Sequence, residues 1–265
     1  MAVEVSEIFL SIQGESSWSG QPCVFIRLTG CNLRCAYCDT SYAYEQGRFM
    51  DIAEILERVR QLRCDLVEVT GGEPLIQAET PSLIRRLLDA GHTVLLETNG
   101  SIDIGMVDPR CVRIMDIKCP SSGMAGQNDL RNLEKLGAQD ELKFVIGSRE
   151  DYEFARDLVR QTYIRHSAKE RHIDCGRPSA MCLAERGRRP LILDALPDLS
   201  MTRDGALAER LLTTIPAARC KINFSPVFGS LAPRSLAEWI LEDHLPVRLN
   251  LQLHKIIWGP EARGV

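Results

Sequence analysis

The chain has 265 residues, 45% of them hydrophobic, and a formal net charge of −4, so it is long enough for one α/β domain with a sizeable core. The slightly acidic balance argues against a polyanion-binding surface, and we expect no nucleic-acid partner. No apolar run approaches the roughly 18 residues of a membrane span, no signal peptide is recognisable, and the cysteines form no disulfide pattern, so we expect a soluble cytoplasmic protein without a membrane partner.

Apolar runs and helical periodicity alternate along the chain. Strands are predicted at residues 24–29, 66–69, 93–97, 112–118, 142–146, 221–224 and 247–253. Helices are predicted at residues 51–62, from Pro81 to shortly before Gly91, and at 150–161 and 233–243. We expect Asp51 and Glu54 to form a capping pair in the first helix, and Thr80 to be the N-cap of the second. This β-then-α order indicates an α/β fold with a mainly parallel sheet, and a partial (β/α)6 TIM-like barrel fits it.

Residues 163–216 interrupt this alternation before the C-terminal strands. A connection of this length is unusual in a compact domain unless it is an insertion. It contains His166, His172, Cys175 and Cys182, but their spacing matches no pattern of a metal site. We therefore predict a single domain over residues 1–265 with a surface insertion at 163–216, in which residues 206–212 form a short helix.

Three cysteines lie close together directly after the strand at 24–29, in the order Cys31-Asn-Leu-Arg-Cys35-Ala-Tyr-Cys38. Thiolates are soft ligands that suit iron–sulfur clusters and zinc. A fully ligated cluster or structural zinc site normally has four protein ligands. Because this group stops at three, one iron of a [4Fe–4S] cluster would stay open to another ligand, which favours a reactive centre. The alternatives are zinc with a distant fourth ligand, or three unrelated core thiols.

A second motif, Thr70-Gly-Gly-Glu-Pro74, follows the strand at 66–69. Glycines there let the backbone approach a ligand closely, and a carboxylate can accept hydrogen bonds from an ammonium group. Together the cysteine triplet and this motif resemble the radical S-adenosylmethionine (SAM) superfamily. The resemblance implies a [4Fe–4S] cluster whose open iron binds the methionine end of SAM, and a reduced cluster that cleaves SAM to a 5′-deoxyadenosyl radical.

Further motifs narrow the resemblance. They are Ile12-Gln-Gly-Glu15, Phe25-Ile-Arg27-Leu-Thr-Gly30, Cys38-Asp-Thr40, Glu97-Thr-Asn-Gly100, Asp116-Ile-Lys118-Cys-Pro-Ser-Ser-Gly123, Ser225-Pro-Val-Phe-Gly229 and Leu251-Gln-Leu-His254-Lys-Ile-Ile-Trp258-Gly-Pro260. This combination resembles the 7-carboxy-7-deazaguanine synthase family of the queuosine and 7-deazapurine pathway. The resemblance implies a carbon–nitrogen lyase that converts 6-carboxy-5,6,7,8-tetrahydropterin to 7-carboxy-7-deazaguanine, after hydrogen abstraction from C6 and with loss of ammonia. It also implies that SAM is regenerated and that a magnesium ion assists.

The same resemblance assigns roles to individual residues. The implied cluster ligands are Cys31, Cys35 and Cys38. The implied substrate contacts are Ile12, Gln13, Gly14, Glu15, Arg27, Thr70, Glu97, Gln252 and His254. The implied SAM contacts are Tyr37, Cys38, Asp39, Gly72, Glu73, Asp116, Ile117 and Lys118, and Thr40 matches the magnesium-contacting position. Arg27 suits the carboxylate of the substrate because its planar guanidinium can bind a carboxylate through two nitrogens.

Several of these residues also fit purely structural roles. Arg27 fits an outward-facing strand residue that forms an ion pair. Asp116 and Lys118 share one face of a strand, which fits a simple ion pair between them. His254, at the end of a predicted strand, suits a core histidine with satisfied hydrogen bonds. Thr40 suits the cap of the next helical turn.

Two other functions fit parts of the sequence. A glycyl-radical activase uses the same cofactors on a protein substrate, but residues 13–15 and 251–255 favour a pocket for a small molecule. A non-catalytic iron–sulfur electron carrier, or a zinc-stabilised scaffold, requires a fourth ligand such as Cys64, Cys111 or Cys119. The family resemblance also implies a flavodoxin-like reductant and a homodimer.

Overall fold

The computed structural model describes residues 1–173 and 220–264, and of residues 162–173 it describes the backbone only. Most of the predicted insertion at 163–216 therefore lies outside the described residues. The same holds for Cys175, Cys182, the short helix predicted at 206–212, and the side chains of His166 and His172. Within the described part of the chain, no helix combines the length and apolar character that crossing a bilayer requires.

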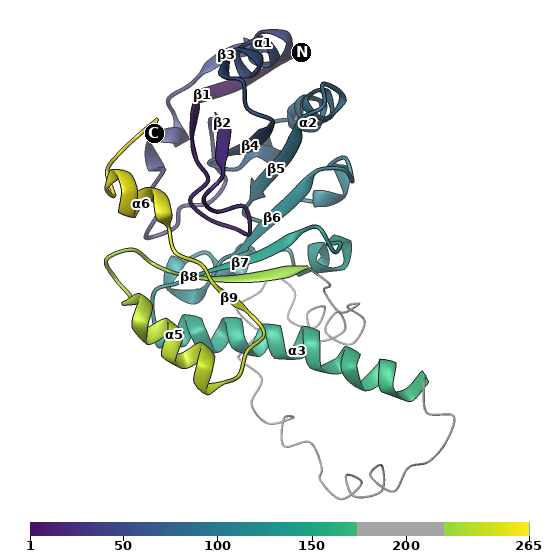
Figure 1. Cartoon of the computed structure of the whole chain (residues 1–265), viewed down its shortest axis with the longest axis vertical. Coiled ribbons are helices and arrows are strands. Elements are labelled where there is room, and N and C mark those ends of the chain that lie inside the picture. Colours follow the sequence, from purple (N-terminus) through teal and green to yellow (C-terminus); the bar gives the residue numbers. More distant parts are fainter. Residues whose placement is uncertain (174–219, 265) are drawn as a thin grey trace, which may run out of the picture.

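One sheet of nine strands, in the order β3-β1-β2-β4-β5-β6-β7-β8-β9, runs through the molecule (Figure 1). The strands are β1 (Ala2–Ile12), β2 (Pro22–Leu28), β3 (Arg48–Asp51), β4 (Leu66–Gly71), β5 (Thr93–Thr98), β6 (Val112–Ile117), β7 (Glu141–Ile146), β8 (Lys221–Pro226) and β9 (Arg248–Leu249). From β2 through β4 to β9 every neighbouring pair is parallel, whereas β1 pairs antiparallel with both β2 and β3. The sheet stays open, because β3 and β9 form its two edges. This is the predicted partial barrel of parallel strands, with β1 and β3 added at one edge.

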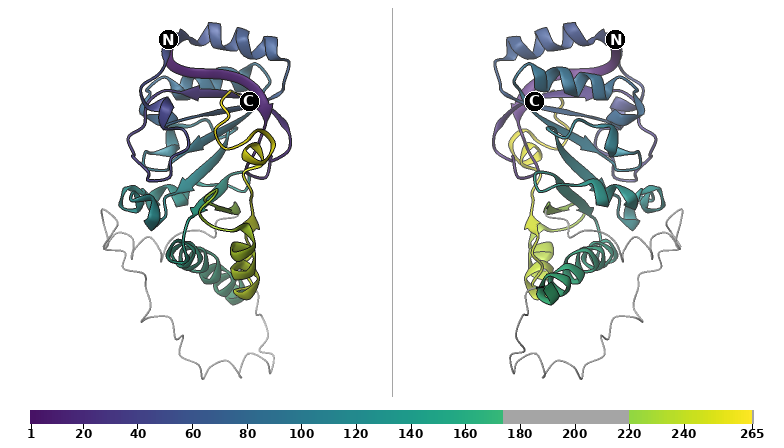
Figure 2. Two further views of the ribbon diagram at one scale, coloured as in Figure 1. Left: turned by 90° about the vertical axis from the view of Figure 1, so that its left-hand side faces the viewer. Right: turned by 90° about the vertical axis from the view of Figure 1, so that its right-hand side faces the viewer.

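Most helices cover the outer face of the sheet, whereas the last one, α6, lies on the concave side. The α-helices are α1 (Ile52–Leu62), α2 (Thr80–Asp89), α3 (Arg149–Ile173), α5 (Pro233–Glu242) and α6 (Leu253–Trp258). The 3-10 helices are η1 (Ser41–Tyr44), η2 (Pro74–Ile76), η3 (Ile104–Met106), η4 (Pro120–Ser122), η5 (Ala125–Gln127) and η6 (Leu130–Lys135). Both views of Figure 2 place α3 and α5 side by side, where Tyr152 packs against Trp239. The connections from β5 to β6 and from β6 to β7 contain 3-10 helices only, so the alternation of strands and α-helices is less regular than predicted.

The strands separate apolar from polar side chains with a period of two residues. On β4, Val67 and Val69 belong to the core under the helices, whereas Glu68 and Thr70 border a cavity on the concave face. The core continues along the neighbouring strands with Val24, Ile26, Leu28, Val94, Leu96, Met115, Ile117, Leu142, Phe144, Ile146, Ile222 and Phe224. A second, smaller apolar cluster contains Cys23, Phe25, Leu66, Leu95, Val112 and Ile114, near the amino ends of the strands. The concave face is therefore apolar at one end and polar along the rest.

The C-terminal segment differs from the prediction. A strand was predicted at 247–253, but only Arg248 and Leu249 pair with β8, and the chain then enters α6 at Leu253. The alternating residues suggested a strand, yet the Asn250 side chain is hydrogen-bonded to the backbone of Ser16 through both its oxygen and its nitrogen. These contacts with the loop after β1 favour the observed conformation over the strand that the alternating residues predict.

Helix boundaries and caps also differ. α3 extends to Ile173, beyond the predicted end at 161 and into the predicted insertion. Asp51 occupies the N-cap position of α1 without a hydrogen bond from its side chain, and Glu54 instead binds Arg48. Thr80 lies inside α2, and its hydroxyl donates to the carbonyl of Pro74. Strand β1 was not predicted.

A buried ion pair fixes the start of β6 against the turn before β7. The Asp140 carboxylate is fully buried, accepts two hydrogen bonds from the Arg113 guanidinium and accepts others from the backbone N–H groups of Arg113 and Gly137. Removing one partner of such a pair leaves an uncompensated buried charge.

We expect Asp140→Ala to lower the free energy of unfolding by about 3–5 kcal/mol, measured by urea denaturation. Glu153→Ala, which removes a pair between exposed side chains on α3, is the matched control and should change it by at most about 0.5 kcal/mol. Equal effects of the two substitutions would contradict the prediction.

Candidate active site

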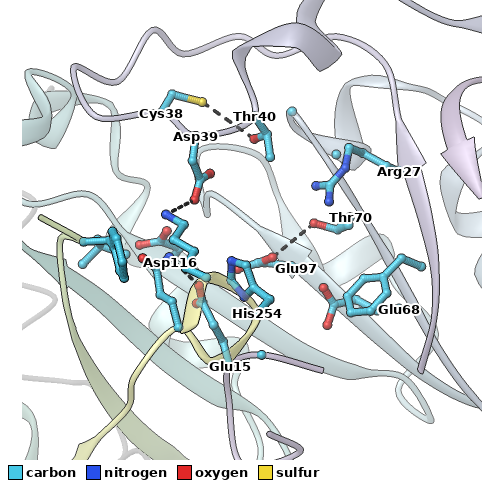
Figure 3. A pocket seen from close by; sticks show the side chains of 18 of the residues that line it. Glu15, Arg27, Cys38, Asp39, Thr40, Glu68, Thr70, Glu97, Asp116 and His254 are labelled. Atoms are coloured by element: carbon cyan, nitrogen blue, oxygen red, sulfur yellow. Dashed lines mark hydrogen bonds and ion pairs between the residues drawn. The ribbon is translucent and has the colours of Figure 1, made fainter. Parts of the chain in front are cut away.

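A cavity of about 540 Å³ lies on the concave face of the sheet, within the size range of small-molecule sites. Every residue predicted for the cluster, SAM, magnesium and substrate borders it except Glu73 and Ile117. Figure 3 shows Cys38 and Thr40 toward one end of the group and Glu15 and Glu68 toward the other. The tertiary structure thus brings together residues that are up to about 240 positions apart in the chain, because the strands wrap around a common interior.

The loop with the three cysteines follows the carboxyl end of β2. Its backbone is held by a hydrogen bond from Ala36 N–H to Ser122 O (3.0 Å) and by one from the Asn99 side chain to Asn32 (3.1 Å). Burial raises the pKa of the Cys31 and Cys35 thiols, and the nearby Cys38 raises both further. Iron would replace the thiol protons, and Lys118, which lowers the pKa of both thiols, favours the thiolate forms that bind metal.

The Gly-Gly-Glu-Pro motif packs against the start of the cysteine loop. A Cβ atom at Gly72 would overlap the carbonyl oxygen of Gly30 and lie 2.6 Å from Cys31 Cβ, so only glycine permits the close approach. The Glu73 side chain is fully buried behind the cavity wall, where it accepts hydrogen bonds from Leu75, Thr98 and Asn99. Ile117 points into the core under the helices. Neither side chain is brought to the cavity, and Glu73 connects the ends of β4 and β5.

Several charged side chains lie beside the cysteine loop. Asp116 and Lys118 form an ion pair (2.8 Å), as the structural alternative suggested, yet both border the cavity and Asp116 Oδ1 is buried without a partner in the described structure. Burial alone would lower the pKa of Lys118, but Asp116 and Cys35 together reverse this, so that the pKa is raised. Asp39 is paired with Lys255 (2.5 Å). The Tyr37 hydroxyl donates to the carbonyl of Val145 (3.1 Å).

Arg27 points into the cavity and not to the outer face. Its Nε donates to Glu7 (2.7 Å), and Tyr42 donates its hydroxyl proton to the same carboxylate oxygen. Figure 3 shows the guanidinium directed toward the interior, between Thr40 and Thr70. Thr40, at the N-cap position of η1, makes no capping hydrogen bond, and its hydroxyl lies 3.8 Å from Cys38 Sγ. The structural alternatives therefore hold only in part: Arg27 does form an ion pair but borders the cavity, and Thr40 does occupy the cap position but without a hydrogen bond from its side chain.

The far end of the cavity is rich in carboxylates. Lys143 on β7 is paired with Glu97 on β5 (2.7 Å) and with Glu15 in the loop after β1. Thr70 donates its hydroxyl proton to Glu97 (3.1 Å), and Gln13 donates to Glu68. Burial raises the pKa of Glu68, and the negative charge of Glu97 raises it further. This end therefore presents mainly hydrogen-bond acceptors.

The start of α6 closes one side of the cavity. Gln252 donates to Glu15 (2.7 Å), and Leu253 N–H donates to Gly14 O (2.9 Å). A Cβ atom at Gly14 would overlap the His254 ring, so these two segments require glycine where they meet. His254 lies on α6 and not at a strand end. Burial lowers the pKa of His254, although the negative charge of Glu15 acts in the opposite direction. The lowered pKa keeps the imidazole neutral near pH 7.

The sequence reasoning missed Glu68 and Lys143, and it gave no role to Lys255 within the segment 251–255; all three border the cavity. A signal for the first two was present, because each is a charged residue flanked by apolar residues in a strand, which marks the face opposite the core. Residues 259–264 also border the cavity, and only Gly259 and Pro260 among them belong to a motif that the sequence analysis recognised. In Figure 1 this tail and α6 lie across the sheet from α1 and α2.

The proposed fourth ligands for zinc or a closed cluster lie elsewhere. Cys64 donates to the carbonyls of Pro22 and Leu66, at the amino ends of β2 and β4 and away from the cysteine loop. Cys111 and Cys119 are fully buried in the core under the helices. None of the three borders the cavity.

Comparisons with known proteins identify the family. The model of the radical SAM superfamily matches residues 25–115. The 7-carboxy-7-deazaguanine synthase of Koribacter versatilis is 40% identical over 99% of this chain and 100% of its own length, and that of Chlorobaculum tepidum is 41% identical over 99% and 97%. The chain belongs to the 7-carboxy-7-deazaguanine synthase family. It is therefore a radical SAM enzyme, and the electron-carrier and activase alternatives are set aside.

A solved structure agrees on the fold. The crystal structure of QueE from Escherichia coli matches with a TM-score of 0.64 at 20% sequence identity, covering 95% of this chain and 94% of that one. At this level of identity the likeness confirms the fold: an open, mainly parallel α/β sheet with helices on one face.

The residues present fit the cofactors that this family uses, a [4Fe–4S] cluster, SAM and Mg²⁺. The possible ligands at the cavity are the three thiols of one loop, the Thr40 hydroxyl directly after that loop, and the Asp116 oxygen that has no partner in the described structure. Thiolates suit the iron of a cluster, and a hydroxyl suits magnesium.

We expect Gly72→Ala to lose most of its iron after reconstitution, because the added methyl meets backbone atoms that no side-chain rotation can move away. Gly137→Ala is the control, since its Cβ would lie at an ordinary 3.6 Å from Asp140. The measurement is iron content per chain, and full iron loading of Gly72→Ala would show the prediction to be wrong.

We expect Glu68→Gln to raise the melting temperature, increasingly so as the pH rises. The pKa of Glu68 is raised above its unfolded value, so its contribution to stability is lost as pH rises toward the folded pKa, by up to about 1.4 kcal/mol per pH unit. Glutamine is neutral at every pH and removes this loss. Melting curves at about pH 6 and about pH 8 test it, with the exposed Glu238→Gln as control, and a constant difference from wild type would refute it.

Proposed function

We propose that this protein converts 6-carboxy-5,6,7,8-tetrahydropterin to 7-carboxy-7-deazaguanine with release of ammonia, as a step of queuosine or 7-deazapurine biosynthesis. One observation carries this proposal beyond family membership. A single cavity connects the three cysteines to an end rich in hydrogen-bond acceptors, and Arg27 borders the same cavity. A pterin carboxylate presents N–H donors on one edge and an anion on the other, which matches this distribution.

The substrate contacts follow from the chemistry of the side chains. Arg27 would bind the substrate carboxylate, because Glu7 fixes its Nε and Figure 3 shows the guanidinium directed inward. Glu15 and Glu97 would accept from the N–H groups of the ring, with Gln13 and Thr70 beside them. The remaining proposed contacts are Ile12, Gly14, Gln252 and His254.

The cofactors would lie at the cysteine end. Cys31, Cys35 and Cys38 would hold the cluster, and the Thr40 hydroxyl would contribute a magnesium ligand. The proposed SAM contacts are Tyr37, Asp39, Gly72, Asp116 and Lys118, while Glu73 and Ile117 would act from behind the cavity wall. When bound, the cluster and SAM supply the radical that removes hydrogen from C6 of the substrate.

The chain itself positions and shields the reactants. The apolar cluster around Phe25, Leu95 and Ile114 closes the interior below the carboxylates. The tail at 259–264 borders the cavity on the side away from the helices, where Arg263 stacks on the Tyr42 ring at 4.2 Å. Neutral His254, beside Glu15, is able to accept or donate a proton near the carboxylates. Such enclosure keeps water from the reacting atoms.

We extend the proposal to the partners and location. A flavodoxin-like reductant in the cytoplasm would supply electrons to the cluster, whose loop exposes Asn32 and Arg34 at the surface. A homodimer is supported by the exposed apolar residues Ile256, Ile257 and Trp258 on α6, which a second subunit would cover.

The proposal is tested by an anaerobic assay of reconstituted protein with SAM, reductant, Mg²⁺ and 6-carboxytetrahydropterin, with the product followed by mass. We expect 7-carboxy-7-deazaguanine from wild type and a complete loss in Cys35→Ala, because two thiolates cannot hold the cluster. Cys64→Ala, which changes a cysteine outside the cavity, should keep the activity. SAM cleavage without this product would overturn the proposed substrate.

A further inference from the structure

Lys143 is a buried cation in the middle of a central strand. Its side chain is only 7% exposed and borders the cavity from β7. It reaches past β6 to Glu97 on β5 and across the interior to Glu15 in the loop after β1. A well-packed apolar residue at such a position is often as stable as a buried ion pair, so stability alone does not account for this lysine.

Three other cations at the cavity each form an ion pair with one carboxylate, whereas Arg263 stacks on the Tyr42 ring. Lys118 is paired with Asp116, Lys255 with Asp39, and Arg27 with Glu7. Lys143 differs because it contacts two carboxylates at once. The group of Glu15, Lys143 and Glu97 therefore carries a net charge of −1 when all three are ionised, and we call it the acceptor triad.

The ionisation states of the acceptor triad depend on Lys143. Burial alone would raise the pKa of Glu97, but Lys143 outweighs it and holds that pKa below its usual range. Burial would lower the pKa of Lys143, and Glu15 and Glu97 together reverse this. Glu68 forms no ion pair with the described residues, and burial, followed by the negative charge of Glu97, raises its pKa in opposition to Lys143. Lys143 thus favours the ionised form of Glu97, whereas the environment of Glu68 favours its protonated form.

The hydrogen bonds of the triad leave it facing a ligand. Glu15 accepts from Gln252 Nε2 through one oxygen and meets Lys143 through the other. Glu97 accepts from Thr70 through one oxygen and from Lys143 through the other. Each carboxylate oxygen has two lone-pair directions, so both carboxylates keep acceptor capacity toward the cavity that they border.

We propose that Lys143 is the positioning residue that fixes Glu15 and Glu97 as a pair of ionised acceptors. The pocket thereby selects rings that carry an amino group over rings that carry an oxo group at the same position. This inference rests on the proposed function, because a 2-amino-4-oxopyrimidine edge donates N–H bonds where a 2,4-dioxopyrimidine presents a carbonyl. A carbonyl oxygen against two ionised carboxylates has no proton to share and is repelled.

Loss of Lys143 would change what the triad recognises. Two carboxylates that lose their shared cation repel each other, and in a buried site one of them takes up a proton. A protonated carboxyl donates a hydrogen bond, so it would tolerate the oxo group that the ionised pair rejects. Lys143→Met should therefore reduce the discrimination between the two rings and not merely the affinity for both.

The test measures binding of 6-carboxypterin and 6-carboxylumazine, which differ by this amino-to-oxo exchange, to reconstituted protein with SAM by equilibrium dialysis. We expect wild type to prefer the amino compound on the order of 100-fold or more, and Lys143→Met to reduce this ratio at least about tenfold. Lys221→Met is the matched control, because Lys221 lies on the adjacent β8 at the surface and does not border the cavity. It should leave the ratio unchanged.

Two further variants keep the proposal testable if Lys143→Met folds poorly. Glu15→Gln retains Lys143 but replaces an ionised acceptor by an amide, and it should also lower the ratio. In the Glu15→Gln background, Lys143→Met should lower the ratio of the two affinities by a smaller factor than it does in wild type. The reason is that one of the two carboxylates that the lysine holds is already gone. Additive effects of the two substitutions would overturn the proposal.

The outcomes separate this inference from the proposed function. A Lys143→Met protein that binds both compounds more weakly but with the wild-type ratio gives Lys143 a purely structural role and overturns the inference alone. A wild-type protein that forms no 7-carboxy-7-deazaguanine and binds neither compound overturns the proposed function and the inference with it.

Discussion

The two-residue period of the parallel strands, on a sheet that curves, is the constraint on which the rest of the structure depends. One set of side chains, such as Val67 and Val69, forms the core under the helices, and the alternate set, such as Glu68 and Thr70, faces the interior. Because the sheet curves without closing, the interior sets of β2 and β4 to β7 converge on one cavity. A site with charged walls is possible here because the apolar burial that stabilises the fold takes place on the other face.

Burying so many charged groups requires that nearly all of them have partners. The pairs of Asp116 with Lys118 and Asp39 with Lys255, together with the acceptor triad, meet this requirement with bonds between segments that are distant in the chain. The same contacts determine shape, because the triad connects β5, β7 and the loop after β1, and Gln252 adds the start of α6. Ionisation, orientation and tertiary architecture therefore depend on one network.

The cavity has two chemically different ends, and the proposed reaction uses both. Soft thiols gather where the loop leaves β2, and hard carboxylate oxygens gather deeper in the interior. In the proposed reaction, a radical generated at one end would meet a substrate held from the other, and the separation of the two donor sets would orient the reaction. The glycines at positions 14 and 72 let neighbouring wall segments approach each other closely, Gly14 against His254 and Gly72 against Gly30 and Cys31.

The sequence by itself determined the features that are local: the three cysteines, the Gly-Gly-Glu-Pro turn, the family resemblance, and most strands and helices of the partial barrel. The spacing of residues along a short segment is sufficient for these. Tertiary structure alone decided which side chains reach the cavity. It placed Lys143 between Glu15 and Glu97, buried Glu73 behind the wall, and turned the strand-like sequence after Leu249 into α6 through the contacts of Asn250 with Ser16. Such outcomes depend on partners 25 or more residues away in the chain, which no local pattern contains, and on burial, which changes the free energy of every charged group.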